Sequence, residues 1–422
     1  MKSWDELYKE LQTKDLDISK DLVELEKNLN KDGISLCVGA GVTISLVGSW
    51  TQLLNELAVL RCCDEHRRDN TSVSIDIDAM RSFIYKNVRD KAFLPNSTNT
   101  LEQGEYLMYD ALDETAEKLD QHDQALSKYW REMFFSAQTY IVVSKSIDRK
   151  LKKKTIVDHF IEWEKDHSIK PDIASLASLV ELCIKKNVKE IITYNFDTML
   201  DQLLSNEVVW TYFGKKNQQK NVEVYSYPDG KNVGKFCKKK YANRDTIRIY
   251  HVHGILDKDL GISPIVFSEN SYLEYQECVL NWSNVRIADA LIRSPVLCVG
   301  FSGTDPNFRY LCRLLKNNAS LSQNDRSNQK NEGPNVYLTR VYNQDGYSDV
   351  GRFLPRKRNS SGDETNEPID PTDEKDILCT YYCVKTYLKV VQDYYLHQLG
   401  TKVLWAEKYD NIANMIHELA NH

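Results

Sequence analysis

Four short apolar runs of this chain each end in a cluster of glycine, hydroxyl, amide or imidazole residues. The clusters are Gly39-Ala40-Gly41-Val42-Thr43, Thr193-Tyr194-Asn195-Phe196-Asp197, His251-Val252-His253-Gly254 and Gly300-Phe301-Ser302-Gly303-Thr304-Asp305. Such groups can hold phosphate, hydrogen-bond a sugar and move a proton near neutral pH. Because ligands of an open parallel α/β sheet bind where strands end, the four clusters predict one shared binding site.

The first cluster has the spacing of a phosphate-binding turn. Gly39, Ala40 and Gly41 follow an apolar run at 34–38 that predicts a buried strand, and a helix that opens at Ser49 and runs through Leu60 is expected after them. Glycines at such a turn let the backbone approach a pyrophosphate, whose charge is met by amide N–H groups. Ile44 stands where the third glycine of a GxGxxG pattern would be. A plain turn between strand and helix is therefore an equal alternative.

The second cluster supplies an amide and a carboxylate. Asn195 and Asp197 follow a strand predicted at 188–193 and precede a helical stripe that begins at Phe196. Both residues can face a ligand at the strand end. Asparagine is also a common N-cap, and an acidic residue suits the first turn of a helix. Taken alone, the two residues favour this structural interpretation.

The third cluster supplies a candidate base. His251 and His253 fall on one face of a strand predicted at 246–252 because side chains alternate along a strand. His253 is followed by Gly254, so a substrate can approach it, and imidazole titrates near neutral pH. A hydrogen-bonded structural histidine is the alternative. His251 is the weaker candidate because no glycine opens space beside it.

The fourth cluster follows a strand predicted at 295–299. Ser302 has no evident structural duty and is a candidate ligand. Asp305 precedes Pro306, which is the pattern of an N-cap with proline at the first helical position. Capping therefore accounts for Asp305 by itself.

The composition bounds the class of protein. The 422 residues are 41% hydrophobic and 27% charged, with a formal net charge of -6, so no overall attraction to nucleic acid or anionic membrane is expected. The lysine-rich segment 215–240 resembles a nucleic-acid patch, but a solvated hairpin face is favoured. No apolar run is long enough to span a bilayer and no signal peptide is evident, which predicts a cytoplasmic protein without membrane contact.

Cysteine spacing argues against a zinc module. The chain has ten cysteines, most of them inside apolar runs, as at Cys37, Cys183 and Cys298. This placement predicts reduced core residues, and the spacing contains no CxxC pair. We therefore expect no metal site.

The pattern predicts an α/β protein with a parallel Rossmann-like sheet and a large helical insertion. We expect an N-terminal helix and the first part of the core in 1–61, a helical insertion lobe in 62–169 and the remaining core in 170–422. Further strands are predicted at 335–341 and 402–405. A β-rich excursion is predicted at 208–248, and a mobile loop at 352–375.

In their order along the chain these clusters, with Ser268-Glu-Asn-Ser-Tyr272 and Lys402-Val-Leu-Trp-Ala-Glu-Lys-Tyr-Asp410, resemble the sirtuin-like (SIR2-like) domains of bacterial antiphage defence proteins. The resemblance covers about residues 20–60 and 170–422 and leaves the helical insertion unmatched. Thr43 stands where that family has serine in a GAGxS pattern, which keeps the hydroxyl.

The resemblance implies a Rossmann-type domain of sirtuin type that binds NAD and cleaves the bond between nicotinamide and ribose. On this basis Gly39, Ala40, Gly41, Val42 and Thr43 hold the pyrophosphate, Asn195 and Asp197 orient the nicotinamide ribose, and His253 is the base. Ser302 contacts ribose or phosphate, and Trp405 lies near adenine. Tyr194, Gly300, Phe301 and Asp305 complete the predicted NAD-binding set.

One departure decides which reaction is expected. Deacylating sirtuins carry a four-cysteine zinc module after the catalytic His-Gly, and 255–275 contains no cysteine. Water then becomes the natural acceptor, which predicts an NAD hydrolase that releases nicotinamide and ADP-ribose. The resemblance further implies a latent effector of antiphage defence, a homo-oligomer, and a separately encoded partner such as a DNA translocase. An NAD-dependent deacylase or ADP-ribosyltransferase, and a non-catalytic sensor of NAD or ADP-ribose, are the alternatives.

Overall fold

The computed structural model describes a defined part of the chain. The described residues are 19–47, 156–165, 173–215, 218–233, 245–256, 280–303, 305–322, 334–341, 356–358, 364–368, 386–392, 394–406 and 409–422, with single residues Glu56, Val59, Ala79, Ile265, Val266, Tyr272 and Tyr275. The helix expected after Ser49, most of the predicted insertion and much of the lysine-rich segment lie outside these residues.

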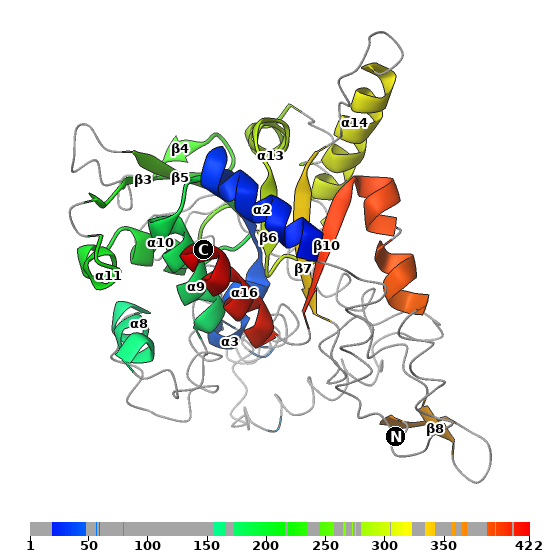
Figure 1. Ribbon diagram of the computed structural model, residues 1–422, viewed down its shortest axis with the longest axis horizontal. Coiled ribbons are helices and arrows are strands. Elements are labelled where there is room, and N and C mark those ends of the chain that lie inside the picture. Colours follow the sequence, from blue (N-terminus) through cyan, green and yellow to red (C-terminus); the bar gives the residue numbers. More distant parts are fainter. Residues whose placement is uncertain are drawn as a thin grey trace, which may run out of the picture. The chain divides into compact units, whose positions relative to one another are not determined.

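The strands form an eight-stranded, mostly parallel sheet in the order β10-β7-β6-β1-β2-β5-β3-β4 (Figure 1). Their bounds are β1 Ile34–Val38, β2 Val188–Thr193, β3 Asn221–Ser226, β4 Lys231–Asn232, β5 Thr246–His251, β6 Val296–Val299, β7 Val336–Val341 and β10 Thr401–Ala406. The sheet and its helices make a Rossmann-like α/β arrangement, which confirms the predicted fold class.

Parallel strands read as unbroken apolar runs because helices cover both faces of their sheet. Every residue of β1 and of β6 is buried. The predicted bounds of β1 and β2 are those observed, and the other predicted strands of the sheet agree within one residue at each end.

Contacts within the chain divide it into two compact units, and the first comprises Met1–Gly39, Ala174–Ile192 and Arg286–His422. Within it β1 pairs with β6, β6 with β7 and β7 with β10, all in parallel. The helices of this unit include α2 Ser19–Lys31, α9 Ala174–Lys185, α14 Pro306–Ser322 and α16 Tyr409–Asn421. Trp405 and Tyr337 are among its largest fully buried side chains.

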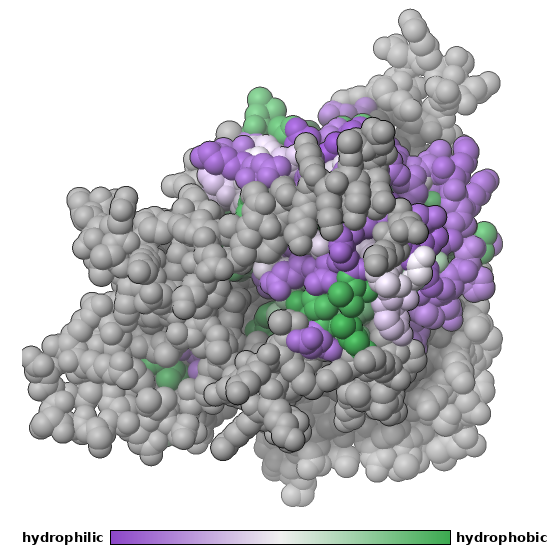
Figure 2. Space-filling model, turned by 90° about the vertical axis from the view of Figure 1, so that its left-hand side faces the viewer, coloured by the Kyte–Doolittle hydropathy of each residue, from purple (hydrophilic) through white to green (hydrophobic). Residues whose placement is uncertain are grey.

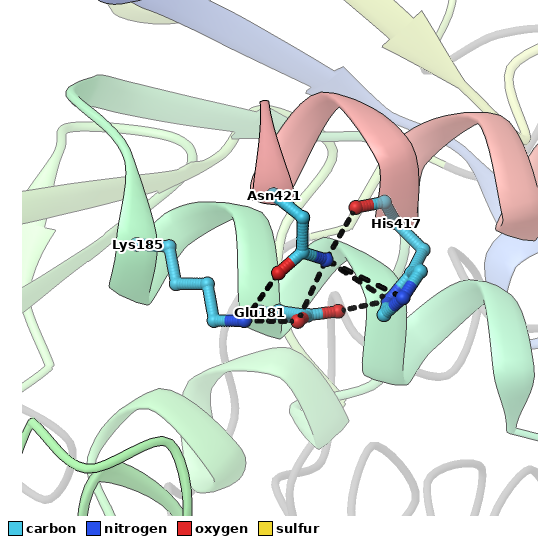
Figure 3. A network of polar contacts seen from close by, with 4 residues as sticks. All are labelled: Glu181, Lys185, His417 and Asn421. Carbon is cyan, nitrogen blue, oxygen red and sulfur yellow. Dashed lines mark hydrogen bonds and ion pairs between the residues drawn. The ribbon is translucent and has the colours of Figure 1, made fainter.

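A polar network joins the C-terminal helix α16 to α9 (Figure 3). The buried carboxylate of Glu181 accepts hydrogen bonds from Lys185 Nζ at 2.6 Å and from Asn421 Nδ2 at 3.2 Å. His417 Nδ1 lies 2.6 Å from the other oxygen of Glu181. Lys185 also donates to Asn421 Oδ1 at 2.7 Å. The network therefore fixes α16 along α9 at its last turns.

The second unit comprises Ala40–Ile173 and Thr193–Val285. Here β3 pairs in parallel with β5 and antiparallel with β4. Its helices include α8 Ile156–Lys165, α10 Met199–Leu204 and α11 Glu207–Tyr212. Phe160 of α8 packs edge-on against Tyr212 and Phe213, with ring centroids 5.9 and 5.7 Å apart.

Two predictions of local structure need correction. The excursion at 208–248 begins with most of α11 before the strands β3 and β4, so its first residues are helical. The predicted loop at 352–375 contains a two-stranded antiparallel sheet of β8 Arg356–Arg358 and β9 Glu364–Pro368. Their sequences, RKR and ETNEP, contain none of the apolar alternation by which strands are recognised.

None of the described helices is both long and apolar enough to cross a bilayer. Most of the coloured surface in Figure 2 is hydrophilic, with a smaller hydrophobic area. Exposed apolar side chains such as Val208 on α11 and Ile292 on α13 (Trp282–Arg293) are ordinary, because much of any folded surface is apolar.

Candidate functional site

The hydroxyl of Thr43 connects two of the predicted site residues in the second unit. It donates to Asp197 Oδ2 at 3.0 Å and accepts from Asn195 Nδ2 at 3.3 Å. Thr43 is buried, and the strand end carries Asn195 and Asp197 to it across 152 and 154 positions of sequence. The structure therefore brings together three residues from two of the predicted clusters.

Asn195 is not the cap of the helix that follows it. The N-cap position of α10 is Thr198, whose side chain makes no cap hydrogen bond, and Asp197 Oδ1 just before it accepts the N–H of Met199 at 3.2 Å. The capping alternative is therefore wrong for Asn195, and Asp197, expected in the first helical turn, lies two residues before the helix begins. Burial raises the pKa of Asp197 above its usual range, against the hydrogen bonds from Met199 and Thr43, which lower it.

The carboxamide oxygen of Asn195 is the atom of this network that lacks a hydrogen-bond partner among the described residues. Asn195 is 8% exposed, and among the described residues its Oδ1 has no hydrogen-bond partner although the atom is buried. Its nitrogen is held by Thr43, so the oxygen has a fixed direction. A buried acceptor without a donor costs free energy and calls for an explanation. A hydroxyl of a bound sugar is one such donor.

His253 lies in an aromatic environment close to this network. Its ring packs edge-on against Tyr194, Tyr272 and Tyr275, with centroids 4.8, 5.1 and 5.4 Å away. Tyr272 Oη lies 3.3 Å from His253 Nδ1. The side chain is 2% exposed, and this burial lowers the pKa of His253 to about 3. His253 is therefore uncharged at neutral pH.

The residue after His253 must be able to turn the chain. Gly254 has a φ of 93°, a conformation that side-chain-bearing residues rarely adopt. Its N–H donates to the carbonyl of His251 at 3.2 Å, and the carbonyl of His253 accepts from Val266 at 2.9 Å. The backbone on both sides of His253 is therefore tied down.

His251, the weaker candidate from the sequence, makes the more extensive set of contacts. Its Nδ1 lies 3.0 Å from the backbone oxygen of Asn195, and its Nε2 lies 3.2 and 3.1 Å from the two carboxylate oxygens of Asp201. Burial alone would lower the pKa of His251. The charge of Asp201 and the hydrogen bonds to Asp201 and to the Asn195 carbonyl together outweigh burial, so the pKa is raised.

In the first unit Gly39 follows β1, which has a later strand, β6, as its parallel neighbour. A Cβ added to Gly39 would lie 2.6 Å from the oxygen of Gly300 and 2.7 Å from Cα of Phe301. Only glycine fits such a contact, so Gly39 and Gly300 are brought together. Close packing thus accounts for Gly39 without a ligand, and its phosphate role stays a prediction.

The remaining predicted residues take varied places. Ser302 is exposed, and its carbonyl accepts from Arg340. Asp305 accepts from the N–H of Phe308 at 2.8 Å and so caps α14, as expected. Phe301 packs edge-on against Phe308 at 5.0 Å. Trp405 is 1% exposed within β10, and its predicted contact with adenine stays a prediction.

Ala40 to Val42 form a 3-10 turn, and the short helix α3 Ile44–Val47 follows it, before the helix that the sequence predicts from Ser49. Val42 is buried within this turn. The turn therefore keeps its largest side chain inside, and the contact of its backbone with phosphate stays a prediction.

Residues 189–334 match the family model of the SIR2-like domain. The chain contains a SIR2-like domain. The match spans Asn195, Asp197 and His253 together with the Gly300 turn, and lies outside the predicted phosphate turn and Trp405. Proteins with SIR2-like domains use NAD, so the match indicates NAD-related activity. No curated protein matches the sequence.

Inspection of the sequence missed two contributors to this part of the SIR2-like domain. Asp201 lies in the apolar stripe of α10 between Leu200 and Leu203, and an acidic residue on a buried face needs a partner. That signal, with His251 on the same strand face as His253, was available in the sequence. The packing of Tyr275 against His253 had no local signal.

Proposed function

We propose that this protein hydrolyses NAD, releasing nicotinamide and ADP-ribose. The observation that carries the proposal is the Thr43 network, which fixes the Asn195 carboxamide and leaves its buried oxygen without a partner among the described residues. The same unit holds His253, whose ring contacts the neighbouring Tyr194. The SIR2-like match supports NAD as the substrate.

Cleavage of the bond between nicotinamide and ribose is helped by oxygen atoms close to the ribose. When nicotinamide leaves, positive charge develops on the ribose carbon to which it was bound. The carboxamide oxygen of Asn195 and the carboxylate of Asp197 can stabilise that charge or orient the ribose hydroxyls. Water then bonds to this carbon and gives up one proton, so that NAD and water become nicotinamide, ADP-ribose and a proton.

His253 is the residue we assign to that proton. If its Nδ1–H donates to Tyr272 Oη, at 3.3 Å, its Nε2 carries the lone pair that a base needs. Burial keeps the ring neutral at pH 7, which is the form that accepts a proton.

Burial also supports latency. His253 and Asn195 are almost enclosed, so NAD reaches them only if neighbouring residues move. A resting state of this kind suits an effector that would otherwise deplete the NAD of its own cell. We therefore propose a triggered role in antiphage defence, with a homo-oligomer and a separately encoded partner as further predictions.

The test follows nicotinamide release from NAD by purified protein, alone and with lysate of phage-infected cells. We expect release by the wild type in an activating condition and a loss on the order of 10²-fold or more in Asn195→Ala and His253→Ala. Asn206→Ala is the matched control, because it removes the side-chain cap of α11 and leaves the site untouched. Undiminished release by both site variants would refute the assignment.

One observation favours a second function, a sensor that binds NAD or ADP-ribose without cleaving it. A base with a pKa of about 3 is weak at neutral pH, so His253 needs a change of surroundings before it can act. Binding of NAD, with recovery of the nucleotide intact under every condition tried, would establish the sensor.

A further inference from the structure

The last residue of β5 contacts the candidate site through the backbone. His251 is 1% exposed, and its two ring nitrogens face two different elements. Nδ1 lies 3.0 Å from the backbone oxygen of Asn195, and Nε2 lies within 3.2 Å of both carboxylate oxygens of Asp201 on α10. The imidazole thus joins the strand end, the Asn195 turn and the following helix.

Both neighbours of the ring are acceptors, which is the arrangement that an imidazolium with two N–H donors satisfies. The charged groups that face the ring are the carboxylates of Asp201 and, more weakly, of Asp197. Among the described residues His251 is the ion-pair partner of Asp201, whose side chain is also 1% exposed. Removing either member of this buried pair would therefore leave the charge of the other uncompensated.

We infer that His251 is a positioning residue of the proposed NAD site. Held by Asp201, it donates to the Asn195 carbonyl and fixes the turn, while Thr43 fixes the carboxamide of the same residue. Asn195 is thereby held through both its main chain and its side chain, which fixes the direction of its carboxamide oxygen. The inference rests on the proposed function and names a residue that acts through Asn195, without contact to NAD.

Two substitutions separate the two halves of this contact. The amide nitrogen of asparagine can take the place of Nδ1, so His251→Asn retains a donor toward the Asn195 carbonyl. The amide nitrogen of glutamine can take the place of Nε2, so His251→Gln retains a donor toward Asp201 and loses the one toward Asn195. Positioning predicts that the glutamine variant is the worse enzyme.

The first measurement is kcat and KM for NAD in the activating condition. We expect His251→Gln to lower kcat on the order of 10²-fold with little change in KM, because a misplaced group costs rate more than binding. His251→Asn should keep a larger share of kcat, and the control Asn206→Ala should keep all of it. Equal kcat in the two His251 variants, or a wild-type kcat in the glutamine variant, would overturn the inference.

The pH profile gives a second readout. Because the pKa of His251 is raised, the imidazolium persists to higher pH than that of an exposed histidine and is lost as pH rises through that pKa. The wild-type kcat should therefore fall on the alkaline side, and His251→Asn should lack that limb. An alkaline limb unchanged in His251→Asn would contradict the inference.

If His251→Asn and His251→Gln fail to fold, both substitutions are repeated in a chain that also carries Asp201→Asn, so that no buried carboxylate is left unpaired.

Hydrogen exchange of the amides at 195–198 separates the positioning inference from the proposed hydrolysis of NAD. If the wild type releases no nicotinamide, the proposed function fails, and faster exchange in His251→Gln than in His251→Asn still establishes the positioning contact. Equal exchange in the two variants overturns it.

Discussion

At the residue scale, the Thr43 hydroxyl is a hydrogen-bond partner of two groups, the Asn195 amide nitrogen and the Asp197 carboxylate. We expect Thr43→Val, which keeps the shape and removes the hydroxyl, to lower nicotinamide release about tenfold or more and the free energy of unfolding by roughly 1–3 kcal/mol. Thr43→Ser should retain most of both, because serine keeps the hydroxyl. Steady-state kinetics and urea unfolding measure the two effects.

The comparison of valine with serine decides whether the hydroxyl matters. If Thr43→Val released nicotinamide as the wild type does, the network would not orient Asn195. If serine were as damaging as valine, the methyl group of Thr43 would be the important part and the hydrogen bonds would be incidental.

His253 makes a separate prediction about pH and stability. Its pKa is about 3 in the folded protein and about 6.5 when exposed, so the unfolded state binds more protons between these values. The stability that goes with neutral His253 is complete above pH 6.5 and falls as pH drops toward 3, approaching roughly 1.4 kcal/mol for each pH unit. His253→Gln should lack this contribution.

The measurement is the difference in free energy of unfolding between wild type and His253→Gln at pH 7 and at pH 5. Carboxylates that are common to both proteins cancel in that difference. A difference that stays constant over this range would mean that the imidazole already titrates as an exposed group.

At the scale of elements, buried parallel strands could be predicted and polar ones could not. The predicted bounds of β1 and β2 were correct because a strand that is buried on both faces is apolar along its whole length. Each apolar run therefore stops where the strand stops, at a glycine or a hydroxyl residue. Among the described strands, β8 and β9 pair with each other alone, and they carry no such pattern.

The candidate site divides in the same way. Asn195, Asp197 and Thr43 could be named from strand ends and the family resemblance, since their positions follow from the sheet. The pairing of His251 with Asp201 depends on how α10 returns against β5, and no local pattern records that distance. Residue type identified the participants, whereas packing decided which histidine holds the turn.

The network between α9 and α16 carries an element-scale prediction. Glu181→Ala removes the acceptor that Lys185, His417 and Asn421 share. Because the partners of this buried carboxylate are partly exposed, we expect a loss of about 1–3 kcal/mol in unfolding free energy, together with faster hydrogen exchange in α16. Glu418→Ala, an exposed residue of α16, is the matched control and should change neither.

At the scale of the whole molecule, a ligand that binds the folded chain must shift its unfolding equilibrium. At about a hundredfold excess over Kd the gain is about 2.7 kcal/mol, which raises the midpoint of thermal unfolding by several degrees in a chain of this size. We expect ADP-ribose, the proposed product, to cause such a rise in the wild type. ADP-ribose is used because the enzyme would consume NAD during the scan.

The variants show where that stabilisation originates. Asn195→Ala should reduce the rise caused by ADP-ribose, since it removes the buried acceptor that faces the ribose in our proposal. Asn206→Ala lowers the starting midpoint by loss of a helix cap and should leave the rise unchanged. A rise of equal size in all three proteins would place the nucleotide away from Asn195, whatever the catalytic result, because binding free energy depends on contact and not on turnover.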